Sequence, residues 1–263
     1  MINNSQQEIV LRDGVPIEKG VVLTKEYLDA NQELFTNYLN HWLLYPDNFL
    51  DTIQNSEDAK HFHLLPFQRI ALRASMRYRY HYLTATRATS KSFTAYLSAF
   101  VRATLLPGSV IMIASDTKGT VIKIAQAKFE EIFRHWPLLR NELANRVDDG
   151  KTGQKTSNNY YDLYLKNGSM ISVVAKDTSR GLRANSAILE ECALIDETSY
   201  NEVLWPQMNI ARREVDGTIN PEEPSSTQTF ITTAAERTVF MYGKLIECAV
   251  NAVLRPKEYF VWG

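Results

Sequence analysis

The sequence has few cysteines, no excess of charge of either sign and no long apolar run. Its two cysteines, Cys192 and Cys248, form no C-x-x-C pair, and the N-terminus does not resemble a signal peptide, so we expect a reduced, cytosolic protein. The net charge of −1 excludes a uniformly basic nucleic-acid-binding surface, so any DNA contact must come from a local patch. No apolar run reaches the roughly 20 residues of a membrane-spanning helix, and we expect no membrane association.

The composition is otherwise that of an ordinary globular protein of 263 residues, with 44% hydrophobic and 22% charged residues. This length fits one large domain or two small ones. We expect an N-terminal arm and helix over residues 1–60, packing on a core over residues 61–263. In the first segment, apolar residues recur at helical spacing from Lys25 to Leu44, and Pro46 ends the pattern.

The stretch from His81 to Thr94 has the order of a strand, a tight loop and a helix. Aromatic and aliphatic residues give way to small and hydroxylated residues, and then to Lys91 and Ser92. The backbone N–H groups of such a loop, the positive end of a helix, a lysine and a hydroxyl together suit a polyphosphate with Mg²⁺. We therefore predict a phosphate-binding loop. The alternative is a polar turn between a strand and a helix, with a solvated lysine.

The predicted loop lacks both glycines of the usual phosphate-binding pattern. Gly-x-x-x-x-Gly-Lys-Ser/Thr reads here as Ala85-x-x-x-x-Ser90-Lys91-Ser92. A residue other than glycine with positive φ costs about 1–2 kcal/mol. We therefore expect either that φ is negative at both positions or that nucleotide binding is weakened.

A glutamine upstream of the loop is a second candidate for nucleotide binding. Gln68 follows a Pro-Phe pair, at the place where many nucleotide-driven motors have an amide that reads adenine through two hydrogen bonds. The alternative is an exposed glutamine at the start of a helix. Four arginines come next, and such a series is more often a solvated helix face than a DNA-binding track: Arg69, Arg73, Arg77 and Arg79.

Apolar patterns after the loop predict a mainly parallel sheet. A continuous apolar run over 110–114 is typical of a strand that is buried on both faces, and helical spacing follows from Val121 to Trp136. Residues 160–174 alternate around Asn167-Gly168, which predicts a β-hairpin with a two-residue turn. The order of strand, loop, helix, strand and helix predicts βαβ units and an α/β fold.

A pair of carboxylates follows a later apolar strand. The run over 187–189 ends in Glu190 and Glu191, of which one could hold Mg²⁺ and the other could polarise an attacking water. Asp196-Glu197 also follows an apolar run, but that run is short, so we prefer the first pair. Either pair could instead be a solvated strand end. The stretch Thr229-Phe230-Ile231-Thr232-Thr233-Ala234 predicts another buried strand, which ends in the hydroxyl groups of Thr232 and Thr233.

In this order and spacing, the motifs resemble the N-terminal ATPase domain of the large terminase subunit of tailed bacteriophages. The resemblance covers the chain from about Trp42 to its end. Each motif is weak alone, and their order is more specific. The motifs are Leu-Pro-Phe-Gln (65–68), Arg-Ala-Thr-Ser-Lys-Ser (87–92), Pro-Gly-Ser-Val-Ile-Met-Ile-Ala (107–114), Asn-Gly-Ser (167–169), Arg-Gly-Leu-Arg-Ala-Asn (180–185), Glu-Glu-Cys-Ala (190–193) and Ile-Thr-Thr-Ala (231–234).

The resemblance implies a P-loop NTPase of the additional-strand type, with a mainly parallel central sheet flanked by helices and a β-hairpin insertion. It implies an ATPase of a viral DNA-packaging motor, which hydrolyses ATP with Mg²⁺ to move double-stranded DNA into a procapsid. The implied partners are the portal protein, the small terminase subunit and further copies in a homo-oligomeric ring, in the cytoplasm of the infected bacterial host. Another P-loop DNA translocase or helicase-like ATPase, and a degenerate P-loop that acts as a non-enzymatic DNA or portal docking module, remain as alternatives.

The resemblance also implies a role for individual residues. The catalytic group is Glu191 with two arginines, Arg87 beside the γ-phosphate and Arg180 as an arginine finger. Ser92 and Glu190 would hold Mg²⁺. The residues implied in nucleotide binding are Gln68, Arg87, Ala88, Thr89, Ser90, Lys91, Ser92, Thr232 and Thr233.

The sequence departs from the family pattern at three points. The loop has no glycine, and the acid pair is Glu-Glu where Asp-Glu is usual. The family's C-terminal nuclease domain has no counterpart within residues 1–263, so we expect no DNA cleavage by this chain.

Overall fold

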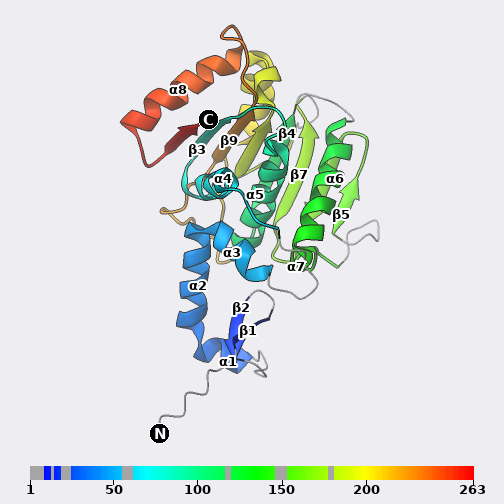
Figure 1. The fold of residues 1–263 in the computed structure, drawn as a ribbon, viewed down its shortest axis with the longest axis vertical. Helices are drawn as coiled ribbons and strands as arrows, with labels where there is room; N and C mark the ends of the chain where they lie inside the picture. The colour runs from blue at the N-terminus through cyan, green and yellow to red at the C-terminus, as the bar shows by residue number, and fades with distance from the viewer. Residues whose placement is uncertain are drawn as a thin grey trace.

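The computed structural model describes residues 9–12, 15–18, 25–54, 62–115, 120–145, 153–176 and 181–263. Its centre is an eight-stranded sheet in the order β10-β3-β9-β8-β4-β7-β6-β5 (Figure 1). The strands from β10 to β7 run parallel, whereas β6 and β5 are antiparallel at one edge. The strands are β3 (Tyr80–Thr84), β4 (Val110–Ser115), β5 (Gln154–Thr156), β6 (Tyr160–Tyr164), β7 (Met170–Ala175), β8 (Ser186–Glu190), β9 (Thr227–Thr232) and β10 (Tyr259–Trp262).

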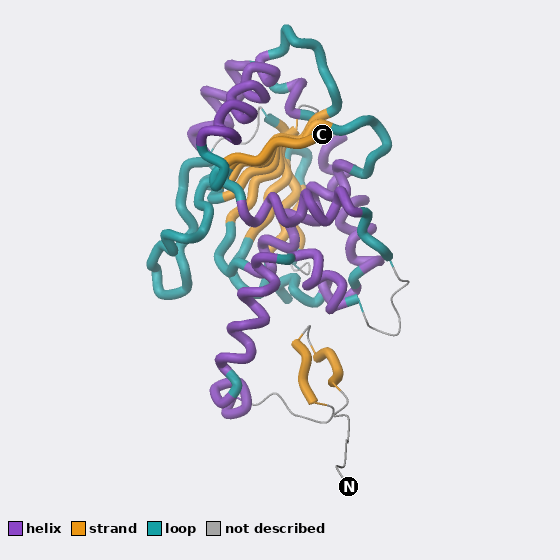
Figure 2. The backbone as a smooth tube through the Cα atoms, turned by 60° about the vertical axis from the view of Figure 1, so that its left-hand side comes forward, coloured by secondary structure: helices purple, strands orange, loops and turns teal. Residues whose placement is uncertain are grey.

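Helices cover both faces of the sheet (Figures 1 and 2). Alternate residues of β4 divide between two cores: Ile111 packs with the helices of one face, and Met112 packs with those of the other. This double burial explains the continuous apolar run of the strand. The first face carries α3 (Pro46–Ile53), α4 (Pro66–Arg77), α5 (Lys91–Leu105), α6 (Thr120–His135) and α7 (Pro137–Arg140), and the second carries η1 (Cys192–Leu194), η2 (Ser199–Leu204), η3 (Trp205–Gln207) and α8 (Phe240–Leu254).

Strand β9 lies between β3 and β8, although it follows both in the sequence. In register, Thr84 of β3 pairs with Thr232, and Glu190 of β8 pairs with Ile231. The carboxyl ends of β3 and β8 therefore lie at the same edge, two strand spacings or about 9.5 Å apart. This inserted strand is the additional strand of the expected P-loop fold, so the predicted fold class is confirmed.

The predicted β-hairpin is present, but its turn differs from the prediction. Leu165 N donates to Ser169 O at 2.9 Å, and Gly168 N donates to Leu165 O at 3.1 Å, so the connection has three residues and not two. Gly168 has a φ of 82°, and it is therefore the residue in left-handed conformation that three-residue hairpin loops usually contain. Strand β7 also pairs with β4, and the hairpin therefore extends the central sheet.

The predicted helix from Lys25 to Leu44 is broken into α1 (Lys25–Ala30) and α2 (Gln32–Leu44), which extend away from the sheet in Figures 1 and 2. At the break, the Asn31 side chain donates to Tyr27 O at 2.8 Å. Pro46 ends the pattern as expected, but it also begins α3, since proline is well tolerated in a first helical turn. Strands β1 (Ile9–Arg12) and β2 (Val15–Glu18) form a separate pair. The expected boundary at residues 60 and 61 lies outside the described residues.

The arginines of α4 hold helices together. Asp47 of α3 is fully buried, and it accepts hydrogen bonds from Arg73 at 2.6 and 2.8 Å and from Arg69 at 3.1 Å. Burial acts to raise the pKa of Asp47, but the arginine hydrogen bonds outweigh it and lower the pKa below its ordinary value. Arg77 donates to Leu44 O at the end of α2. These three side chains are thus engaged in packing, and not in a free basic track.

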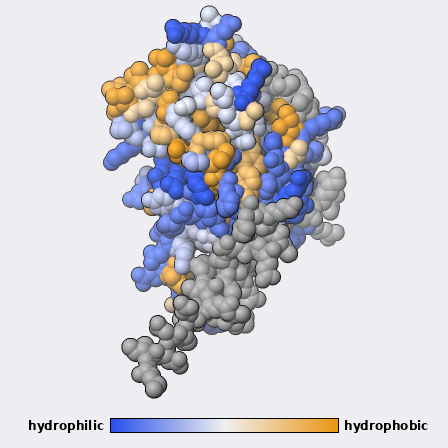
Figure 3. Space-filling view, viewed as in Figure 1, coloured by the Kyte–Doolittle hydropathy of each residue, from blue (hydrophilic) through white to orange (hydrophobic). Residues whose placement is uncertain are grey.

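Helix α8 carries an apolar outward face. Ile246, Val250, Val253 and Leu254 are 46%, 52%, 80% and 70% exposed, whereas Met241 on the inward side is fully buried. Figure 3 shows this apolar surface at the upper left, over α8. Within the part of the chain that the structure describes, no helix is long and apolar enough to cross a membrane.

Candidate functional site

The loop between β3 and α5 begins at the carboxyl edge of the sheet. Ala85 N donates to Thr232 O at 3.1 Å, which ties the start of the loop to the end of β9. Ala88 and Ser90 have φ values of 64° and 56°. Positive φ therefore occurs at Ser90, the second of the two glycine positions, so the first of the two expected alternatives, negative φ at both, does not hold. For a residue with a side chain this conformation costs about 1–2 kcal/mol.

Lys91 is the first residue of α5, and its ammonium group folds back over the loop. Its Nζ donates to Thr86 O at 2.8 Å, and Thr89 Oγ1 donates to the same carbonyl at 2.7 Å. The lysine is 8% exposed. A cation is thus held at the N-terminus of a helix of 15 residues, beside N–H groups that have no partner inside the helix. This arrangement suits an anion.

Glu190, the last residue of β8, lies beside the first turns of α5. Burial raises the pKa of this carboxyl group, the hydroxyl groups of Ser92 and Tyr96 oppose the rise, and the charge of Glu191 adds to it. Ser92 lies in the first turn of α5, and Glu190 ends the strand that packs against this helix, so the structure brings together the two residues that the family resemblance implies as metal ligands. Because one comes from α5 and the other from β8, only the folded sheet creates this pair.

Glu191 is the first residue after β8. Its φ is 47°, another left-handed residue with a side chain. Thr233 Oγ1 donates to Glu191 Oε2 at 3.3 Å, and Ala193 N donates to Thr232 Oγ1 at 3.4 Å. Since Thr232 also accepts from Ala85, the end of β9 contacts both the loop and the segment that contains the acid pair. Strained backbone of this kind is concentrated at functional sites.

The second acid pair has a different environment. Asp196 accepts hydrogen bonds from Ser199 N at 2.8 Å and from the Ser199 hydroxyl at 2.7 Å, and it pairs with Lys176 at 2.9 Å. The Ser199 backbone bond, together with Lys176 and the Ser199 hydroxyl, holds the pKa of Asp196 far below its ordinary range. Asp196 is thus occupied in stabilising the turn that leads into η2.

Gln68 is a buried residue at the start of α4, with 2% exposure, and not the exposed residue of the alternative interpretation. Its Oε1 accepts from Leu65 N at 2.8 Å, so one of the two groups that would read adenine is used to cap the helix. The Arg87 side chain is exposed in the loop. Arg180 lies outside the described residues.

The donor set of the site suits Mg²⁺ that arrives with a nucleotide. The described residues contain no cluster of three or more His, Cys, Asp or Glu side chains that could hold a metal ion. Mg²⁺ is usually bound through one or two protein oxygens, together with phosphate oxygens and water. The Ser92 hydroxyl and the Glu190 carboxylate can supply such oxygens.

Tyr96 is a residue of the site that the sequence analysis did not identify. It lies four residues after Ser92 on α5, which places both side chains on one helix face. That spacing from the Lys-Ser pair was the only signal in the sequence, and a buried aromatic residue at such a position is usually part of a core.

The sequence matches no known protein-family model and no curated protein. The fold is similar to the solved structure of the large terminase of bacteriophage HK97, with a TM-score of 0.55 and 12% identity over 76% of this chain and 39% of that one. The large terminase of a thermophilic bacteriophage gives a TM-score of 0.50 and 11% identity over 76% of this chain and 46% of that one. This chain therefore spans less than half the length of either protein. At such identities the likeness concerns the fold, and this chain has the α/β fold of phage large terminases.

Proposed function

We propose that this chain is the ATPase of a viral DNA-packaging motor, which hydrolyses ATP to translocate double-stranded DNA into a procapsid. The observation that carries the proposal is the meeting of the Lys91-Ser92 helix start and the Glu190-Glu191 strand end at one edge of the sheet. The fold likeness to phage large terminases supports the same conclusion. The partners in this proposal are the portal protein, the small terminase subunit and further copies in a ring.

The residues of the loop bind and orient the phosphates. Lys91 exchanges its hydrogen bond to Thr86 O for oxygens of the β- and γ-phosphates. The backbone N–H groups of Ala88, Thr89 and Ser90 surround the phosphate chain. The amide nitrogen of Gln68 donates to adenine while its oxygen continues to cap α4.

Glu191 orients the attacking water and accepts its proton. The hydrogen bond from Thr233 limits the rotation of this carboxylate, so that one oxygen stays available for the water. Ser92 and Glu190 hold Mg²⁺, which when bound neutralises charge on the phosphate oxygens. Arg87 and Arg180 stabilise the negative charge of the transferred group, and an arginine in that role contributes on the order of 10³–10⁵ in rate.

The end of β9 connects the nucleotide site to the segment that leads into α8, and so can transmit the loss of the γ-phosphate. Thr232 contacts both the loop and the segment after the acid pair, and Thr233 contacts Glu191. Loss of the γ-phosphate changes the position of Glu191, and this change reaches the segment between β9 and α8. Coupling of this kind is what a DNA translocase requires.

The proposal is tested by MgATP turnover in the presence of DNA and portal protein. Glu191→Gln is expected to lower kcat by about 10²–10⁴ through loss of the proton acceptor, and Lys91→Ala is expected to abolish measurable turnover. The matched controls are Lys166→Ala and Glu222→Gln, two exposed positions outside the site, which should match the wild-type rate.

Equal rates in all variants would contradict the assignment of an ATPase. Absence of turnover in the wild type, with DNA or portal binding retained, would favour a non-enzymatic docking module. Separation of duplex strands without packaging would favour a helicase-like translocase.

A further inference from the structure

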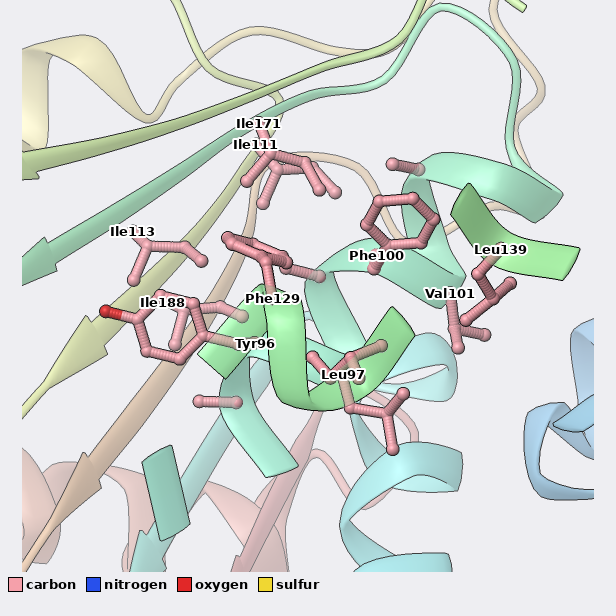
Figure 4. Close-up of a cluster of buried hydrophobic side chains, with 14 of the residues drawn as sticks. Tyr96, Leu97, Phe100, Val101, Ile111, Ile113, Phe129, Leu139, Ile171 and Ile188 are labelled. Atoms are coloured by element: carbon pink, nitrogen blue, oxygen red, sulfur yellow. The ribbon is translucent and has the colours of Figure 1, made fainter. Parts of the chain in front are cut away.

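The hydroxyl group of Tyr96 is a buried polar group without a hydrogen bond. Tyr96 is fully buried, and its Oη makes no hydrogen bond of standard geometry. Figure 4 shows the ring beside Ile188 of β8, with the oxygen pointing away from the apolar cluster. Burial of an unpaired hydroxyl costs free energy, so its presence in a core requires an explanation.

The packing of the ring does not explain the hydroxyl. The Tyr96 ring contacts Phe129 edge to face, with centroids 5.3 Å apart at 85°. Phenylalanine would make the same contact and would bury no polar atom. The oxygen is therefore dispensable for the core.

The group that faces this hydroxyl is the Glu190 carboxylate. Glu190 is 7% exposed, and it ends β8, the strand that packs against α5 and supplies Ile188 to the same buried cluster as Tyr96. Since Glu190 follows Ile188 by two residues, both side chains lie on the face of β8 that meets α5. A glutamate at this place has one more rotatable bond than the aspartate that is usual in phosphate-binding folds. Its carboxylate consequently needs an additional restraint to keep one orientation.

We infer that Tyr96 is a positioning residue, which donates its O–H to one oxygen of Glu190 and leaves the other oxygen directed at the metal of a bound nucleotide. This inference rests on the proposed ATPase function. It explains Glu190 and Tyr96 together: the longer side chain of the glutamate reaches the metal, and the hydrogen bond from the tyrosine fixes the orientation of its carboxylate. Partners of this kind, one shell outside the metal, typically change metal affinity by about 10–100-fold.

The test is the Tyr96→Phe variant, with metal binding measured by the electron paramagnetic resonance of Mn²⁺ in the presence of ADP. We expect the Kd for Mn²⁺ to rise about tenfold or more, because the carboxylate loses its restraint. The melting temperature of the nucleotide-free protein should not fall, since the Tyr96 hydroxyl makes no hydrogen bond of standard geometry in that state. Ser98→Ala is the control, because Ser98 is also a buried hydroxyl of α5 but it bonds to Ala95 O.

A double-mutant cycle with Glu190→Asp separates positioning from packing. In the Glu190→Asp background the shorter acid no longer reaches the hydroxyl, so Tyr96→Phe should change the Kd for Mn²⁺ by less than about twofold. An equal change in both backgrounds would show that the tyrosine acts through packing, and would overturn the inference.

The remaining outcomes distinguish this inference from the proposed function. Wild-type affinity in Tyr96→Phe, with binding lost in Lys91→Ala, would overturn the inference and leave the ATPase assignment intact. Absence of Mn²⁺–nucleotide binding in the wild type would overturn both.

Discussion

Three residues with side chains occupy left-handed backbone at the candidate site: Ala88, Ser90 and Glu191. The pattern of small residues predicted the loop, but it could not predict the sign of φ. The hydrogen bond of Ala85 to β9, together with the bond of Lys91 to Thr86 within the loop itself, holds the loop in a conformation that residues with side chains disfavour. Ser90 thus adopts the left-handed conformation that glycine would adopt more easily, and this conformation lowers the stability of the folded protein.

Replacement of Ser90 by glycine should relieve this cost. Ser90→Gly is expected to stabilise the protein by about 0.5–1 kcal/mol, because relief of the left-handed strain exceeds the added entropy of the unfolded glycine. Ala85→Gly is the control, since Ala85 has no positive φ and should gain only the entropic penalty. Thermal unfolding measures both. A lower melting temperature for Ser90→Gly than for the wild type would show that the loop is not strained there.

At the scale of elements, periodicity predicted the helices and strands well, and the contacts between them poorly. The apolar runs of β4, β8 and β9 and the spacing of α6 were visible in the sequence. The break at Asn31 was not visible, because the apolar spacing continues through it; the Asn31 side chain and its backbone N–H both donate to Tyr27 O there. Nor could the roles of Arg69 and Arg73 be predicted, since their partner Asp47 lies on another helix.

The ion pairs of Asp47 predict a stability that depends on pH. Asp47→Asn should lower the free energy of unfolding by about 2–3 kcal/mol at neutral pH, because it leaves Arg73 without its buried partner. The pKa of Asp47 is lower in the folded protein than its ordinary value of 3.8. The ionised Asp47 carboxylate therefore contributes fully to the free energy of unfolding at pH values above 3.8. This contribution is lost as the pH falls through the lower pKa of the folded protein.

Urea unfolding at about pH 7 and about pH 3 measures this dependence. The difference in the free energy of unfolding between the wild type and Asp47→Asn should be smaller at the lower pH. Asp51→Asn is the control, because Asp51 is 46% exposed and also pairs with Arg69. A larger loss of unfolding free energy in Asp51→Asn than in Asp47→Asn would contradict the conclusion that Asp47 is the more important partner of these arginines.

At the scale of the molecule, the order of the motifs and the family they resemble predicted the additional-strand P-loop fold and a mainly parallel sheet, but not the order of the strands. Periodicity could not predict that order either, because it assigns strands but not their neighbours. The pairing of Ser92 with Glu190 likewise follows from the sheet and not from either motif. The buried ion pairs that join distant segments were invisible in the sequence: Glu223 binds Arg212 at 2.8 Å and Arg102 at 3.4 Å, and Arg102 also donates to Ser75 O.

These ion pairs should be important for stability. Burial lowers the pKa of Arg102 to about 10, and Glu223 opposes the change. Glu223→Gln leaves two buried guanidinium groups without their carboxylate, and it should cost about 3 kcal/mol. The exposed neighbour variant Glu222→Gln should cost less than about 0.5 kcal/mol. Chemical unfolding of both variants tests the prediction, and equal stabilities would show that the loop before β9 is not anchored by Glu223.

The place of β9 also limits how this protein can move. Strand β9 is hydrogen-bonded to β3 on one side and to β8 on the other. The loop that contains Lys91 and the pair Glu190-Glu191 therefore both follow strands of one continuous sheet. Sliding one strand past another would break a whole ladder. A movement driven by the proposed ATP hydrolysis would therefore be confined to segments beyond the strand ends, such as the connection over 233–239 and the helix α8 that follows it.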